Sequence, residues 1–107
     1  MIVEITKDEI ITLNKKIISE FGGSFGIQNE SNLDFVLAKV KNTKNIFKKV
    51  AELMHGIIQG HPFLDGNKRT VFEATKIFLL ANSIKLKFVE KELEEFVVNI
   101  AQPEKLS

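Results

Sequence analysis

The residues best suited to chemistry lie together between positions 61 and 69, in the run His-Pro-Phe-Leu-Asp-Gly-Asn-Lys-Arg. Histidine is the residue type best suited to act as a general base for an attacking hydroxyl near neutral pH, so His61 is a candidate for that role. Asp65, a glycine, an amide and two adjacent cations follow it within eight residues. Apolar residues at helical spacing lie on both sides. A short polar segment between core-forming helices is where a small domain can place a functional site.

The second half of this run predicts a helix start that binds anions. Asp65-Gly66-Asn67 is a turn signal directly before a helical pattern, so the helix begins close to Gly66. Its first backbone N–H groups have no intrahelical acceptors and can receive a phosphate. Lys68 and Arg69 oppose the helix dipole there, and a bound polyphosphate would offset that cost. Asp65, at the mouth of the same site, is a suitable oxygen ligand for Mg²⁺ that bridges phosphates.

Each of these residues also has an ordinary structural interpretation when it is taken alone. Phe63 is expected to be a core anchor that fixes the loop. The others would be cap, turn, loop or surface residues: Asp65 as an N-cap, Asn67 as a turn or cap residue, Lys68 and Arg69 as solvated charges, and His61 as a loop histidine. The functional interpretation rests on their occurrence in one order.

The rest of the chain predicts an all-α fold, a compact bundle of about five helices in a single domain over residues 1–107. Thr6 and Glu9 form a capping box that opens a helix ending at Gly22-Gly23. Asn29 or Ser31 caps the second helix, and a third ends at Gly60. The helix over residues 69–82 carries apolar residues on more than one side and is expected to be central and most buried. Residues 84–88 alternate like a short strand, and a last helix covers residues 93–101.

Apolar spacing also predicts which face of each helix is buried. The expected core positions of the first three helices are Ile10, Leu13, Ile17 and Phe21; Leu33, Val36, Leu37 and Val40; and Phe47, Val50, Ala51, Met54 and Ile58. His55 on the third helix is expected to be structural. The basic stretch at Lys39, Lys41, Lys44, Lys48 and Lys49 is expected to be a solvated face.

Composition limits the remaining possibilities. A net charge of +1 gives no reason to expect direct nucleic-acid binding. The absence of cysteine excludes disulfides and thiolate metal sites. No apolar run approaches the roughly 18 residues of a membrane span, and the N-terminal residues do not resemble a signal peptide. We therefore expect a cytoplasmic protein without membrane contact.

The run from His61 to Arg69 resembles the signature of the Fic family, H-P-F-x-[DE]-G-N-x-R, which is a highly specific pattern. Within the family it most resembles the Doc ("death on curing") toxins, which have lysine where most Fic proteins have the second glycine of G-N-G-R. That position is Lys68 here, and Phe72 stands where the larger Fic class carries a second arginine. Gly66 matches the wider family instead, since Doc has alanine there. The likeness extends to the glycine-rich segment at residues 21–27 and to residues 79–83.

The resemblance implies a Doc-like fold, a reaction and its participants. Lys68 implies transfer of the γ-phosphate of ATP, with Mg²⁺, to a Ser or Thr hydroxyl of a target protein, a translation elongation factor of the Tu type. It also implies a separate antitoxin protein as inhibitor. The implied roles are His61 as the base, Asp65 as the Mg²⁺ ligand, Gly66, Asn67 and Lys68 as the anion hole, and Arg69 as a phosphate ligand. Two alternatives stay open: AMP transfer as in typical Fic enzymes, and a non-catalytic module that binds a nucleotide or partner.

Overall fold

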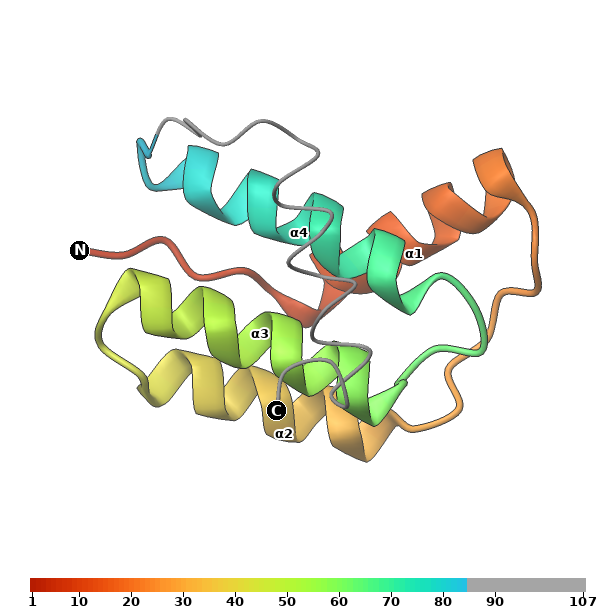
Figure 1. Cartoon of the computed structure of the whole chain (residues 1–107), viewed down its shortest axis with the longest axis horizontal. Coiled ribbons are helices and arrows are strands. Elements are labelled where there is room, and N and C mark those ends of the chain that lie inside the picture. Colours follow the sequence, from red (N-terminus) through yellow and green to blue (C-terminus); the bar gives the residue numbers. More distant parts are fainter. Residues whose placement is uncertain (85–107) are drawn as a thin grey trace, which may run out of the picture.

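The computed structural model describes residues 1–84, which form four α-helices (Figure 1). α1 spans Lys7–Phe21, α2 spans Glu30–Asn42, α3 spans Ile46–Gly60 and α4 spans Asn67–Ala81. The prediction of an all-α fold is confirmed for this part of the chain, whose extended pairing is limited to an isolated bridge between Ile27 and Phe63. The helix predicted at residues 93–101 and nearly all of the segment at 84–88 lie outside the described residues.

The helices pack in the spatial order α2, α3, α4, α1. α3 lies between α2 and α4, and α4 in turn packs against α1 (Figure 1). Seven residues of α4 are buried, compared with five in α3 and three in each of α1 and α2. α4 is therefore the most buried of the described helices, as its apolar pattern predicts. None of the four combines the length and apolar character needed to cross a lipid bilayer.

Local signals set most helix boundaries correctly. The Thr6 hydroxyl accepts a hydrogen bond from the Glu9 N–H at 3.2 Å, and the Glu9 carboxylate accepts one from the Thr6 N–H at 2.9 Å, so the capping box is present. α1 stops at Gly22, whose φ is +91°. Asn29, rather than Ser31, caps α2. α4 begins at Asn67, two residues earlier than the apolar pattern alone predicts.

The predicted apolar faces are partly wrong in α1 and α3. Phe21 is 60% exposed because the last turn of α1 projects beyond its neighbours (Figure 1). Phe47 and Ala51 of α3 are also exposed, whereas Leu53 and Ile57 are fully buried. α3 is covered by α2 on one side and α4 on the other, so its buried surface is wider than a single apolar stripe and rotated away from the predicted one.

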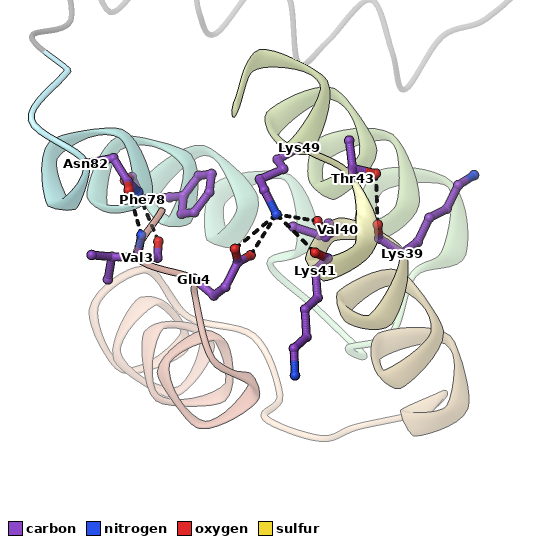
Figure 2. Close-up of polar contacts among 9 residues, drawn as sticks. All are labelled: Val3, Glu4, Lys39, Val40, Lys41, Thr43, Lys49, Phe78 and Asn82. Carbon is purple, nitrogen blue, oxygen red and sulfur yellow. Dashed lines mark hydrogen bonds and ion pairs between the residues drawn. The ribbon is translucent and has the colours of Figure 1, made fainter. Parts of the chain in front are cut away.

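Lys49 is not part of a solvated face, contrary to the prediction for the basic stretch. It is 2% exposed, and its ammonium lies 3.0 and 3.1 Å from the two carboxylate oxygens of Glu4 (Figure 2). It also donates to the carbonyl oxygens of Val40 at 2.8 Å and Lys41 at 3.3 Å, in the last turn of α2. A cation is favourable there because the carbonyl end of a helix carries partial negative charge.

The N-terminal segment is held at a second point by Asn82, just after α4. The Asn82 amide accepts from the Val3 N–H at 2.7 Å and donates to the Val3 carbonyl at 2.9 Å (Figure 2). Val3 thus ties the extended N-terminus to the end of α4, and Glu4 ties it to Lys49 of α3. On the far side of α1, Lys7 pairs with Asp34 and Glu30 of α2, and these two hydrogen bonds raise the pKa of Lys7.

Candidate active site

The polar run begins where α3 ends in a left-handed turn. His61 is the C-cap residue of α3, with φ 47° and ψ 59°, and its N–H donates to the Ile57 carbonyl at 3.0 Å. A residue with a Cβ is destabilised by about 1–2 kcal/mol in this conformation, so histidine is less favourable here than glycine. Its side chain is exposed. Pro62 follows and cannot continue the helix.

The glycine-rich loop after α1 lies antiparallel to the polar run. The Leu64 N–H donates to the Gly26 carbonyl at 2.9 Å, and Ile27 is bridged to Phe63. The Pro62 carbonyl accepts from the backbone of the same loop. Phe63 itself is fully buried. Two loops far apart in the sequence therefore form one unit around this phenylalanine.

Asn67 shapes the loop through its side chain. The Asn67 Oδ1 accepts from the Phe63 N–H at 3.0 Å, and its Nδ2 donates to the Phe63 carbonyl at 2.9 Å. The residue is 7% exposed. The Asn67 amide is therefore engaged within the loop, and the group that Asn67 presents at the helix start is its backbone N–H.

The start of α4 is left open to a ligand. Gly66 is its N-cap, with φ 78° and ψ 17°, and α4 is the only helix within residues 1–84 that has no side-chain cap. The first intrahelical hydrogen bond runs from the Thr70 N–H to the Gly66 carbonyl at 2.8 Å. The N–H groups of Asn67, Lys68 and Arg69 precede it and have no acceptor within the helix. No acidic residue lies in this first turn.

Asp65 is not the N-cap that it resembles when taken alone. Its Oδ2 accepts a hydrogen bond from the Ser24 N–H at 2.8 Å, which joins it to the glycine-rich loop. Gly23, at φ +105°, makes this approach possible, because a Cβ there would lie 3.1 Å from the Asp65 Cβ. The Asp65 side chain stays exposed beside the open helix start.

Asn14 of α1 holds the turn before α4 in place, and the spacing of apolar residues does not identify it. It is fully buried, and its Nδ2 donates to the Asp65 carbonyl at 2.9 Å and to the Thr70 hydroxyl at 3.0 Å. The available signal is a polar residue between Ile10 and Ile17 on an apolar helix face, which marks a buried amide in need of partners.

Arg69 has a partner that its sequence neighbours do not suggest. Its guanidinium lies over the Phe21 ring, 3.9 Å from the ring centroid. The expected core residue Phe21 is thus a surface contact for one of the two cations. Lys68 is exposed.

The polar residues of the run converge on one surface depression of about 370 Å³. It is lined by His61, Leu64, Asp65, Gly66, Asn67, Lys68 and Arg69. His55 lies apart, exposed, in a separate depression of about 340 Å³ between α2 and α3. The depression at residues 61–69 therefore combines an imidazole, a carboxylate, two cations and helix N–H groups that have no acceptor within the helix.

The donor set of this depression fits Mg²⁺ that arrives with a nucleotide. No group of three or more metal-binding side chains occurs within the described part of the chain. Mg²⁺, however, commonly uses one or two carboxylates together with substrate phosphates and water. Asp65 supplies one exposed carboxylate beside the uncapped backbone N–H groups at the start of α4.

Comparison with known proteins places these observations in a family context. Residues 4–79 match the Fic/DOC family. The chain is 27% identical to the protein kinase doc of Escherichia phage P1 over 106 residues, which cover 94% of this chain and 83% of that protein. It is 30% identical to the toxin Doc of Mycolicibacterium smegmatis over 73 residues, which cover 62% of this chain and 56% of that protein.

Proposed function

Because the chain belongs to the Fic/DOC family, we propose that it is a Doc-like toxin that transfers the γ-phosphate of ATP to a Ser or Thr hydroxyl of a target protein. The observation that carries this proposal is the complete polar run, including Lys68, around the uncapped start of α4. The name of the phage relative, a protein kinase, supports the same reaction type.

The phosphates of ATP bind at the start of α4. The backbone N–H groups of residues 66–69 and the positive end of the helix dipole favour an anion. Lys68 adds a point charge, and Arg69 can grip a phosphate with two N–H groups. The bound phosphates offset the cost of placing these positive groups together, since the cations would otherwise oppose the dipole.

Asp65 would hold Mg²⁺ between the protein and the nucleotide. Bound there, the ion would neutralise part of the phosphate charge and orient the phosphates. The hydrogen bond from the Ser24 N–H keeps the carboxylate at the mouth of the depression.

His61 acts as the general base. The target hydroxyl gives its proton to the imidazole while its oxygen forms a bond to the γ-phosphorus. The bond between that phosphorus and the β,γ-bridging oxygen breaks, and ADP leaves. The exposed position of His61 lets a protein-bound hydroxyl reach it.

The partners follow from the family resemblance. A relative named toxin Doc supports a toxin role, with an antitoxin protein that covers the depression. We propose a translation elongation factor as the target. AMP transfer is the second candidate, and Gly66 favours it because glycine at this position is the pattern of the wider family.

Labelled nucleotides decide between these reactions. The purified chain is incubated with Mg²⁺, a bacterial lysate, and ATP labelled at either the γ- or the α-phosphate. We expect label in protein from the γ-position only, and none with His61→Ala. His55→Ala is the matched control, because it removes the other histidine from a separate surface and should leave transfer intact. Label from the α-position would establish AMP transfer, and nucleotide binding without transfer would support a non-catalytic module.

A further inference from the structure

Phe21 is a large apolar side chain that the fold leaves exposed. It is the last residue of α1 and 60% exposed. The Arg69 guanidinium lies over its ring at 3.9 Å, well inside the roughly 6 Å over which a cation is attracted to an aromatic face. The contact joins α1 to the one arginine of the depression.

Phe21 belongs to the face of α1 that lies beside residues 65–69. Asn14, Ile18 and Phe21 are spaced i, i+4 and i+7 and so share one face of the helix. Asn14 holds the Asp65 carbonyl, and a Cβ added at Gly66 would meet Ile18 at 3.3 Å. Phe21 contacts Arg69 at the end of the same face. Because α1 packs against α4, this register sets where the Phe21 ring stands relative to the first turn of α4.

An aromatic partner suits an arginine that must bind an anion. A carboxylate partner would occupy the N–H donors and cancel the charge that attracts phosphate. A ring beneath the guanidinium restrains it while its N–H edge and full charge remain available. An unrestrained arginine side chain has many rotamers, and part of that entropy would be lost on binding.

We propose that Phe21 is a positioning residue that holds the Arg69 guanidinium at the rim of the depression, ready for a nucleotide phosphate. The inference rests on the proposed function for the identity of the ligand. It assigns to the end of α1 a part in substrate binding that lies outside the run at residues 61–69.

Phe25 provides a matched control in the same region. It is also exposed, at 42%, and lies under a cation, with the Lys15 ammonium 5.2 Å from its ring centroid. Neither Phe25 nor Lys15 lines the depression. A general loss of exposed aromatic surface would therefore affect both phenylalanines, whereas positioning of Arg69 concerns Phe21 alone.

The test measures the affinity of the chain for the ATP analogue AMP-PNP with Mg²⁺ by calorimetry. An exposed cation–π contact is worth about 0.5–1 kcal/mol, so we expect Phe21→Leu to weaken binding by about 2- to 5-fold. Phe21→Tyr and Phe21→Trp should retain affinity, and Phe25→Leu should not change it. In an Arg69→Ala background, Phe21→Leu should have no further effect, because the contact is already gone.

A second readout does not depend on nucleotide. In the free protein, ring current from Phe21 should shift the NMR signal of the Arg69 Nε–H, and Phe21→Leu should abolish that shift. An unchanged signal, or unchanged AMP-PNP affinity in Phe21→Leu while Arg69→Ala weakens binding, overturns the inference alone. Failure of the wild-type chain to bind AMP-PNP would overturn the proposed function and the inference with it.

Discussion

Single residues of the polar run divide into those that shape the loop and those that face solvent. Asn67 and Phe63 are buried, and the two hydrogen bonds between the Asn67 amide and the Phe63 backbone close the loop. His61, Asp65 and Lys68 are exposed. The buried pair contributes geometry, and in the proposed reaction the exposed groups contribute charge and proton transfer. A contiguous motif thus contains both a scaffold and an exposed polar surface.

Asn67→Ala is expected to destabilise the fold. It leaves the buried N–H and carbonyl of Phe63 without partners, and an unsatisfied buried group costs about 1–3 kcal/mol. Urea denaturation should show a loss of about this size in the free energy of unfolding. Asn42→Ala, at the exposed end of α2, is the control and should stay within about 0.5 kcal/mol of the wild type. Equal losses in both variants would contradict the assigned role of the Asn67 amide.

At the scale of elements, buried polar contacts determine how the helices meet. Asn14 links α1 to the turn before α4, and Lys49 links α3 to the end of α2 and to the N-terminal segment through Glu4 (Figure 2). Both are polar residues at positions from which water is excluded. A buried donor is costly unless it is paired, and the Asn14 Nδ2 and the Lys49 ammonium are both paired, so each of these donors favours one arrangement of its neighbours.

Lys49→Met should cost more stability than its neighbour Lys48→Met. The first change removes the partner of the Glu4 carboxylate and of the Val40 carbonyl, for an expected loss of about 1–3 kcal/mol. Glu4 is about one-third exposed and regains water, which keeps the loss below that of a fully buried pair. Lys48 is exposed, and its replacement should change stability by less than about 0.5 kcal/mol. Urea denaturation measures both, and similar values would show that the Lys49 contacts do not stabilise the fold.

For the whole molecule, the site depends on contacts between distant parts of the chain rather than on overall charge. The net charge is only +1, so in the proposed function attraction of a polyphosphate comes from the local grouping of Lys68, Arg69 and the start of α4. That grouping lies where the loops after α1 and α3 meet (Figure 1). A ligand bound there should therefore stabilise the folded chain as a unit.

ATP with Mg²⁺ should raise the melting temperature of the whole chain. At a nucleotide concentration of about 100 times Kd, linkage predicts about 2.7 kcal/mol of added stability. Differential scanning calorimetry should show a smaller shift for Arg69→Ala, and also for the wild type when EDTA removes Mg²⁺. Lys44→Ala, which removes an exposed cation outside the depression, should keep the full shift. A shift lost equally in both variants would point to unspecific charge attraction.

The sequence by itself determined the features that depend on close neighbours. The capping box at Thr6, the stop at Gly22 and the start of α4 close to Gly66 each involve interactions within a few residues. The polar run is contiguous, so its family resemblance and its convergence on one depression were also predictable.

Only the tertiary structure decided which distant residues complete the site. Asn14 lies 51 residues from Asp65, and Ser24 lies 41 residues from it. Apolar spacing predicted that Phe21 is buried, but its side chain is exposed. Spacing gives the face of the helix on which a side chain lies and does not show where the helix extends beyond the helices that pack against it. The charge of Lys49 predicted a solvated side chain. Its partners are the Glu4 carboxylate and backbone carbonyl groups of another helix, which are distant in the sequence. These contacts depend on how the helices pack, and local conformational preferences do not determine that packing.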